Sequence, residues 1–266
     1  MIHRISLATD FTEEGAPAFR AALSLAVVCR ARLDILHVGD SSERSEWQNF
    51  PHVRETLEAW QLLAPGSRQE DVQSLLGVGI SKVEIHGGAP ALGIADFVAK
   101  HTPDILVAAS HGRTGRPWWH GGSVAMEAMR RAAVPALLFG PSSREAVDPR
   151  GALRLHTALM PVAETPNPRG SLMKIHELLD RLAPDVHVLH VETAGNSAAS
   201  VRSMYPQAVC VTGEVVPSIL EASEKLQVDF IAMPTARNKG LIGVLLGSTT
   251  EKVLHAATCP VLALPG

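Results

Sequence analysis

The sequence predicts an α/β fold made of two copies of one domain, each with a five-stranded, mostly parallel sheet covered by helices on both faces. Two observations predict this fold. Short apolar runs alternate with longer helical segments along the chain, which is typical of parallel sheets. Landmark residues also recur at constant spacings. The length of 266 residues fits two domains of ordinary size.

The repeat is clearest in the downstream part of each copy. The segment DILVAAS opens at Asp104 and DFIAMPT opens at Asp229, a spacing of 229 − 104 = 125 residues. The same spacing relates Gly88 to Gly213, Gly115 to Gly240, Gly122 to Gly247, Ser123 to Ser248 and Pro135 to Pro260. Five landmarks at one spacing, with Gly122 and Ser123 counted as one, indicate an internal duplication.

The upstream part of each copy aligns at a longer spacing. LDILHV ends at Val38 and VHVLHV ends at Val191, a spacing of 191 − 38 = 153, which also aligns Asp10 with Ala163. The first copy therefore carries 153 − 125 = 28 extra residues between Val38 and Gly88. Apolar residues at helical spacing in this stretch predict an inserted helix within about residues 43–80 that the second copy largely lacks. They are Phe50, Val53, Leu57, Trp60 and Leu63.

The elements of the first copy follow one order, which the second copy repeats. Strands are expected at 5–9, 33–38, 82–86, 104–109 and 135–139, and helices at 16–30, 91–101 and 123–132. The polar, Pro- and Gly-containing segment 141–152 marks the boundary. We therefore expect one domain at 1–143 and a second at 152–266.

Composition excludes several classes of partner. A net charge of −3 and 4% aromatic residues argue against binding to nucleic acid or to anionic lipid. The apolar runs are too short for a membrane helix or a signal peptide, and three cysteines without metal-ligand spacing suit a reducing compartment. A cytoplasmic protein is expected.

A glycine-rich loop, SHGRTGRPWWHGGS at 110–123, follows the fourth strand of the first copy. Ligands of such sheets bind beyond the carboxyl ends of the strands, and glycines let backbone N–H groups approach a phosphate. Ser123 either caps the next helix or donates to a phosphate oxygen. Asp10, at the end of the first strand, either accepts hydrogen bonds from a ribose or adenine group or caps a helix beginning near Glu13.

Signatures of nucleotide-dependent enzymes are missing. The chain has no GxxxxGK[ST], no SGGxDS and no HIGH, and GVGISK lacks the last glycine of a dinucleotide fingerprint. No nucleophile stands beside an orienting base in a recognisable arrangement. His111 and His120 lack further metal ligands at suitable spacing, and Trp118 and Trp119 favour packing or a partner contact. An enzyme is not expected, although slow incidental ATP hydrolysis would be compatible with the loop.

These residues resemble the universal stress protein family in its tandem two-domain form. ATP-binding members of that family carry G-x2-G-x9-G-[ST] after the fourth strand and an Asp after the first. The matching register here is Ala109-x2-Gly112-x9-Gly122-Ser123, with Asp10 as the acidic residue. The resemblance implies Rossmann-like, adenine nucleotide α-hydrolase-like domains that bind ATP or AMP, with or without Mg²⁺.

The same resemblance implies the site residues of the first copy. Val38 would pack against adenine, Ala108 and Ala109 would contact the sugar, and the phosphates would lie on four loop residues. These are Gly112, Gly122, Ser123 and Val124. Ala8, Asp10 and Arg113 complete the expected set. Alanine at 109 replaces the first motif glycine, which should weaken the contact with the ribose.

The second copy departs from the motif at most of its polar positions. Ala163 stands where the first copy has Asp10, Pro234 replaces Ala109 and Arg237 replaces Gly112, although Gly247 and Ser248 remain. Proline lacks an N–H donor, and the arginine fills space that a phosphate would need. Arg237 could bind an anion directly or be a solvated surface residue. Nucleotide binding is therefore expected in the first copy only.

Three functions remain open on the sequence. The first is a stress-response regulator that binds an adenine nucleotide and acts on an unknown protein partner. The second is a scaffold that does not bind nucleotide, and the third is a slow ATPase. The last strands of the two copies should pair within the chain as a pseudo-dimer, which protects both edges. Pairing of the whole chain with a second copy is left open.

Overall fold

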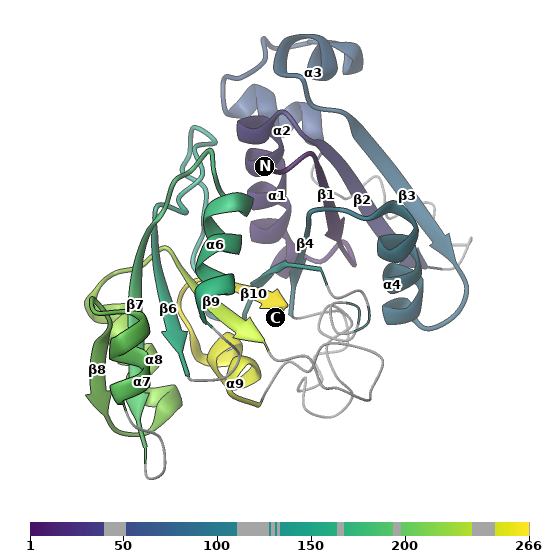
Figure 1. Ribbon diagram of the computed structural model, residues 1–266. Helices are drawn as coiled ribbons and strands as arrows, with labels where there is room; N and C mark the ends of the chain where they lie inside the picture. The colour runs from purple at the N-terminus through teal and green to yellow at the C-terminus, as the bar shows by residue number, and fades with distance from the viewer. Residues whose placement is uncertain are drawn as a thin grey trace.

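The computed structural model describes residues 1–39, 52–110, 128, 131, 134–163, 168–193, 198–235 and 248–265. These residues form one continuous sheet with helices on both of its faces (Figure 1). The sheet consists of two five-stranded halves, one from each copy of the repeat. The predicted α/β fold with two Rossmann-like halves is therefore confirmed.

The first half follows the predicted order of elements. Its strands are β1 (Arg4–Ala8), β2 (Arg32–Gly39), β3 (Ile80–His86), β4 (Ile105–Ala109) and β5 (Ala136–Phe139). Its described helices are η1 (Glu13–Gly15), α1 (Ala16–Cys29), α2 (Val53–Ala59), α3 (Gln69–Leu76) and α4 (Pro90–His101). Of the helix expected at 123–132, only residues 128 and 131 are described, and both are helical.

The second half repeats this order. Its strands are β6 (Thr157–Val162), β7 (Asp185–Glu192), β8 (Val209–Thr212), β9 (Phe230–Thr235) and β10 (Val261–Pro265). Its described helices are α6 (Pro168–Leu178), α7 (Ala198–Met204), α8 (Val215–Lys225) and α9 (Ser248–Ala256).

The two halves join through their last strands. The strand order is β3-β2-β1-β4-β5-β10-β9-β6-β7-β8, and every neighbouring pair is parallel except β5 and β10. In this antiparallel pair Leu137 lies opposite Leu262, its own equivalent in the repeat, because 137 + 125 = 262. A pseudo-twofold axis therefore passes between these two leucines, as the predicted pseudo-dimer requires.

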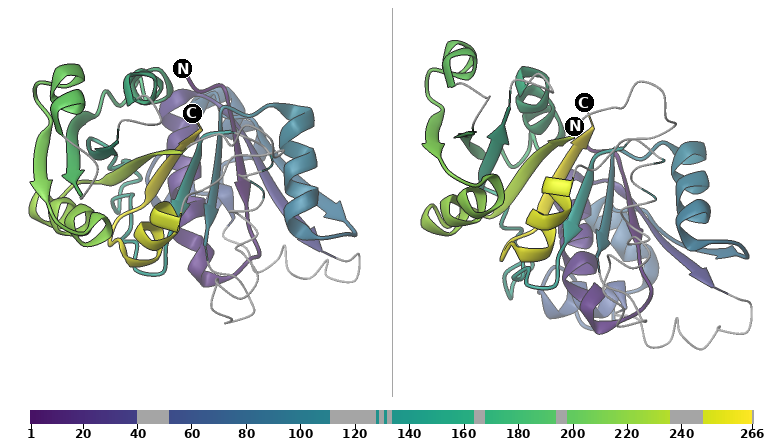
Figure 2. Two further views of the ribbon diagram at one scale, coloured as in Figure 1. Left: turned by 60° about the horizontal axis from the view of Figure 1, so that its bottom comes forward. Right: turned by 90° about the horizontal axis from the view of Figure 1, so that it is seen from below.

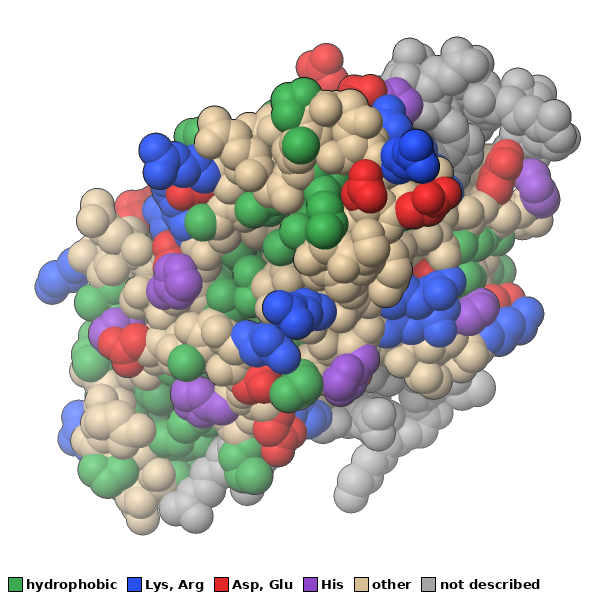
Figure 3. Space-filling view, turned by 90° about the horizontal axis from the view of Figure 1, so that it is seen from above, with side chains coloured by type: hydrophobic (Ala, Val, Ile, Leu, Met, Phe, Trp, Pro, Cys, Tyr) green, Lys and Arg blue, Asp and Glu red, His purple; other side chains and the backbone are tan. Residues whose placement is uncertain are grey.

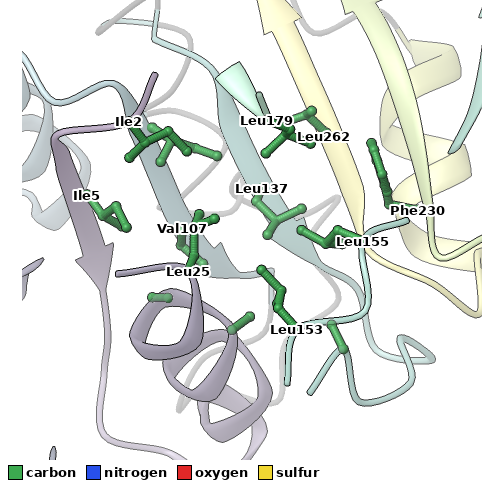
Figure 4. Close-up of a cluster of buried hydrophobic side chains, with 14 of the residues drawn as sticks. Ile2, Ile5, Leu25, Val107, Leu137, Leu153, Leu155, Leu179, Phe230 and Leu262 are labelled. Atoms are coloured by element: carbon green, nitrogen blue, oxygen red, sulfur yellow. The ribbon is translucent and has the colours of Figure 1, made fainter. Parts of the chain in front are cut away.

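Two apolar clusters fill the space between the sheet and its helices. The first cluster lies under α1, α2, α3, α6 and α7, and the second lies under α4, α8 and α9. Two further views show helices on both sides of the sheet (Figure 2). Figure 4 shows the first cluster continuing from Ile5 and Val107 in one half to Phe230 and Leu262 in the other. The halves thus share a core.

One hydrogen-bond pattern occurs at the same place in both halves. The Asp104 Oδ2 atom accepts hydrogen bonds from the N–H groups of His3 at 2.7 Å and Arg4 at 2.9 Å. The Asp229 Oδ2 atom likewise accepts from His156 at 2.8 Å and Thr157 at 3.0 Å. These carboxylates tie the start of the fourth strand of each half to the start of the first. The duplication therefore extends to individual contacts.

The inserted segment differs from the single helix that its apolar spacing predicts. Two helices, α2 and α3, lie within it, and residues 40–51 are outside the described residues. Helix α2 ends at Ala59 because Gln61 adopts a left-handed φ of 61° before the turn at Gly66. Trp60 and Leu63 lie beyond the helix yet remain buried. The second half has the short helix α7 at the corresponding place between β7 and β8.

The boundary segment 141–152 is ordered and contacts both halves. Glu145 accepts a hydrogen bond from the Arg20 Nε atom of α1 at 2.7 Å, and the Arg144 N–H group donates to the Thr258 carbonyl oxygen at 2.8 Å. Ala146 and Val147 are buried. The polar link predicted from the sequence is therefore packed onto the molecule rather than a free tether.

Candidate functional site

The carboxyl ends of β1, β2 and β4 meet at one edge of the sheet. Ala8 of β1 lies opposite Leu36 of β2 on one side and Ala108 of β4 on the other. Asp10 and Val38, two residues further along their strands, therefore lie at the same edge. Figure 2 shows this end of the molecule from below in its right panel.

This edge is also where the chain connections diverge. Helix α1, which follows the carboxyl end of β1, packs in the first apolar cluster, whereas Ala128, a helical residue that follows β4 in the chain, belongs to the second. The connections that leave β1 and β4 therefore pass to opposite faces of the sheet. Ligands of open parallel sheets bind at such a divergence.

Asp10 is half-buried, and its carboxylate is oriented by the next turn of the chain. The Oδ1 atom accepts hydrogen bonds from the Thr12 N–H group at 3.2 Å and from the Thr12 Oγ1 hydroxyl at 2.7 Å. Thr12, rather than Asp10, is the N-cap residue of η1, and its side chain makes no capping hydrogen bond. Asp10 thus forms an Asx turn that leads into the helix and stands two residues before the N-cap position.

Three neighbours that were not predicted from the sequence support this turn. Phe11 has a left-handed φ of 62°, its N–H group donates to the Thr9 Oγ1 atom at 3.1 Å, and its ring stacks on His37 with centroids 4.0 Å apart. The His37 Nδ1 atom lies 3.0 Å from the Thr9 carbonyl oxygen. Because a carbonyl only accepts, Nδ1 must carry a proton. The stacked rings of Phe11 and His37 therefore join the carboxyl ends of β1 and β2.

The internal repeat could have identified His37 as a residue with a structural role. His37 recurs as His190 at the spacing of 153 residues, inside the LHV that both second strands share. The His190 Nδ1 atom lies 2.9 Å from the Val162 carbonyl oxygen, the equivalent of Thr9. Because both copies keep this contact although the second lacks the acidic residue, it serves the junction of the first two strands.

The small residues predicted for the sugar and adenine lie on two faces of the sheet. Ala8 and Val38 are half-buried at the edge of the second apolar cluster, and Ala108 belongs to that cluster with 1% of its surface exposed. Ala109 is half-buried and packs against the first cluster. The Ser110 N–H group donates to the Phe139 carbonyl oxygen at 2.8 Å. Strand pairing therefore continues to the start of the glycine-rich loop.

The residues predicted for the phosphates lie outside the described residues. They are Gly112, Arg113, Gly122, Ser123 and Val124. The same holds for His111, Trp118, Trp119 and His120. The structure thus places Ala8, Asp10, Val38, Ala108 and Ala109 at the carboxyl ends of neighbouring strands, with Ala109 on the other face of the sheet from Ala8, Val38 and Ala108. The binding roles of these residues and of the phosphate loop stay predictions.

The equivalent edge of the second half has a different surface. Ala163 is exposed there and has no carboxylate. Pro234 lies within β9 opposite Leu264, and the Thr235 Oγ1 hydroxyl donates to the Leu264 carbonyl oxygen at 3.1 Å. Arg237 and Gly247 lie outside the described residues, and Ser248 opens α9. The polar groups described at this edge therefore serve the fold.

The cysteines are poorly suited to nucleophilic chemistry. Burial raises the pKa of Cys259 to about 11 and raises that of Cys29 above its ordinary value, so both thiols stay protonated near neutral pH. The Cys210 Sγ atom contacts the Ala208 carbonyl oxygen at 3.8 Å. Within the described ranges, no three His, Cys, Asp or Glu side chains are grouped as a metal site would require.

Charge on the opposite end of the molecule is mixed. Seen from above, Lys and Arg side chains alternate with Asp, Glu and apolar groups (Figure 3). On the described part of this face, no broad field of one sign covers the surface. In the part of the chain that the structure describes, no helix combines the length and apolar character needed to cross a bilayer.

Comparison with known proteins gives the family. The model of the universal stress protein family matches residues 1–140 and 205–265, together more than half of the chain. The chain belongs to the universal stress protein family. A curated relative, universal stress protein A homolog 1 of Coxiella burnetii, is 43% identical to this universal stress protein over 54 residues. That match covers 20% of this chain and 37% of the relative.

Solved structures match the whole chain of this universal stress protein. One from Archaeoglobus fulgidus is 17% identical, covers 98% of this chain and 96% of its own, and has a TM-score of 0.67. A putative universal stress protein from Pseudomonas aeruginosa is 18% identical, covers 99% and 93%, and has a TM-score of 0.65. At these identities the likeness establishes the fold, including its arrangement in two halves.

Proposed function

We propose that this universal stress protein binds one adenine nucleotide, ATP or AMP, in its first half and acts as a regulator of protein partners. The observation that carries the proposal is the placement of Asp10, Val38 and Ala109 at the neighbouring carboxyl ends of β1, β2 and β4. A half-buried carboxylate beside small and apolar side chains suits a ribose hydroxyl and an adenine ring.

The second half supports a single site per chain. Ala163 stands where the first half has the Asp10 carboxylate, and the Thr235 hydroxyl donates its hydrogen bond to the carbonyl oxygen of Leu264. A nucleotide seated there would find neither the acidic acceptor nor the backbone donor that Pro234 has lost. Arg237 remains a candidate for a separate anion contact.

A regulatory role agrees better with this site than catalysis does. The described strand ends offer no paired carboxylates and no activated nucleophile, so any hydrolysis of ATP would be slow and incidental. The three free thiols suit the reducing cytoplasm, where we expect the protein to act. A scaffold without nucleotide is the second candidate, because the methyl group of Ala109 stands where the family motif has glycine.

Isothermal titration calorimetry with ATP and with AMP tests the proposal. The wild type should bind one nucleotide per chain, and Asp10→Ala should weaken binding by about tenfold or more, as expected for loss of a hydrogen bond to a charged group. Ala109→Gly should strengthen binding, because it removes the methyl group from the expected ribose contact.

Asp180→Ala provides the matched control, since this exposed carboxylate lies just beyond α6, away from the strand ends of the first half. Thermal melting of each variant shows whether the Asx turn at Asp10 is also needed for folding. If titration with millimolar ATP or AMP released no heat of binding, the nucleotide proposal would fail and the scaffold function would be favoured. Two sites per chain would contradict the assignment to the first half.

A further inference from the structure

The outer side of β3 is an open edge of the ten-stranded sheet. β3 pairs with β2 on one side, and in the described part of the chain no strand pairs with its other side. Figure 1 shows β3 and β8 at opposite margins of the molecule. With seven residues β3 is the longer of the two edge strands. Open edges of this length invite pairing with another strand.

Backbone groups of alternate residues point away from β2. The Leu33 N–H group donates to the Gly79 carbonyl oxygen, so the backbone at position 79 faces β2. By the alternation of a strand, the N–H and C=O groups of Ile80, Lys82 and Glu84 face outward. Ile80 packs with the first apolar cluster, whereas Val83 and Ile85 pack with the second. The side chains of Lys82 and Glu84 therefore share the sheet face of Ile80.

Charge along this edge is self-complementary in one antiparallel register. When Val83 lies opposite Val83 of a second copy, Lys82 faces Glu84 of that copy, and the reverse pair forms by symmetry. Shifting the register by two residues in either direction places Lys82 opposite Lys82, or Glu84 opposite Glu84. Parallel pairing in register also places like charges together. Opposite charges on directly facing residues stabilise a strand pair, and like charges destabilise it.

We propose that two copies of this chain associate through their β3 strands, antiparallel about Val83, with Lys82 of each copy paired to Glu84 of the other. The twofold axis would stand perpendicular to the sheet and extend it from ten strands to twenty across the dimer. This inference is independent of nucleotide binding, because it rests on residues along the outer side of β3 and not on the carboxyl ends of β1, β2 and β4.

The other free edge does not offer an equivalent partner. β8 contains Val209, Cys210, Val211 and Thr212, none of which is charged. Pairing of β3 with β8 would place no charged residue of β8 opposite Lys82 or Glu84, and as a head-to-tail contact it would continue into open filaments rather than close. A closed dimer through β3 is therefore favoured over a chain of molecules.

Sedimentation velocity over micromolar to submillimolar protein, with a charge-swap series, tests this dimer. The wild type should dimerise, and Lys82→Glu alone or Glu84→Lys alone should weaken dimerisation by at least about tenfold, because each creates two like-charge pairs. The double variant Lys82→Glu/Glu84→Lys should dimerise as the wild type does. An equimolar mixture of the two single variants should form a heterodimer, because every facing pair is then opposite in charge.

Lys225→Glu, at the exposed end of α8, is the matched control and should leave the dimer unchanged. Hydrogen exchange gives a second measurement, since the outward amides of Lys82 and Glu84 should be protected only at concentrations where the dimer forms. A wild type that stays monomeric throughout would overturn the proposal. So would a dimer that both single variants leave intact, or concentration-dependent growth beyond two copies.

Discussion

Gly151 shows how closely the link between the halves approaches the inserted segment of the first half. Its φ is +83°, and a Cβ atom placed on it would lie 2.5 Å from Cδ2 of Trp60. The Ser24 Oγ hydroxyl of α1 donates to the Gly151 carbonyl oxygen at 2.6 Å. The indole ring, α1 and the link thus share one contact, which only glycine permits at this position.

Gly151→Ala should therefore lower the free energy of unfolding by about 2–4 kcal/mol, from overpacking against Trp60 and from the left-handed backbone. Gly66→Ala isolates the second cause, because Gly66 has a φ of +78° and nothing within 4 Å of a Cβ atom. That variant should lose only about 1–2 kcal/mol. Urea unfolding followed by tryptophan fluorescence measures both. Equal losses would show that the Trp60 ring yields to the methyl group.

At the scale of elements, the same side-chain contact anchors the first strand of each half. Asp104 precedes β4 and Asp229 precedes β9, and each carboxylate accepts two N–H groups at the start of β1 or β6. These contacts join strands that are adjacent in the sheet but about one hundred residues apart in the chain in the first half. They fix the relative heights of the strands and hence the level at which their carboxyl ends meet.

Asp104→Ala and Asp229→Ala should each lower the free energy of unfolding by about 1.5–3 kcal/mol, because each leaves two backbone donors without their charged acceptor. The corresponding Asn variants keep one acceptor oxygen and should lose less. Chemical denaturation of the four variants, with Asp180→Ala as the exposed control, measures the effect. If only one of the two Ala variants lost stability, the repeated contact would have different roles in the two copies.

At the scale of the whole molecule, the halves are joined by a strand pair and by a shared core. Leu137 and Leu262 face each other across the pseudo-twofold axis with at most 1% of their surfaces exposed. Leu153 and Leu155, just beyond the link, belong to the same apolar cluster as residues of both halves (Figure 4). A core that crosses the boundary couples the stability of one half to that of the other.

The chain should therefore unfold in one cooperative transition, which probes placed in the two halves can test. All four tryptophans lie in the first half, whereas the buried thiol of Cys259 lies in the second. Tryptophan fluorescence and pulsed labelling of Cys259 should report the same midpoint in urea. Leu137→Ala should shift both midpoints together, at a cost of about 2–5 kcal/mol. Separate midpoints would show that the halves unfold independently.

Much of the fold could be predicted because the chain contains it twice. The spacing of 125 residues aligned the fourth and fifth strands of the two halves, and the pairing of β5 with β10 confirmed the expected pseudo-dimer. The inserted segment was predicted less well. Its apolar spacing was read as a single helix, whereas Trp60 and Leu63 continue the buried face in a turn beyond α2. Periodicity records burial and not the backbone that achieves it.

The candidate site was predictable where it depends on strand order and not where it depends on long-range contacts. The position of Asp10 follows from the rule that parallel strands end at one edge, whereas Val38 and Ala109 were implied by the family resemblance, and the roles of all three stay predictions. The stacking of Phe11 on His37 escaped prediction, because it joins side chains from two strands and requires a left-handed residue after Asp10. Such a conformation is rare outside glycine and leaves little trace in local sequence.

The sequence by itself determined the duplicated α/β architecture, the pairing of the two halves and the loss of the acidic residue from the second half. These depend on patterns of apolar, glycine and charged residues that recur along one chain. Only the tertiary structure decided the packing of Trp60 on Gly151, the turn that orients Asp10, and the matching of Lys82 and Glu84 along an open edge. Each of these depends on distances and directions between elements, which are set by packing in three dimensions and not by local spacing.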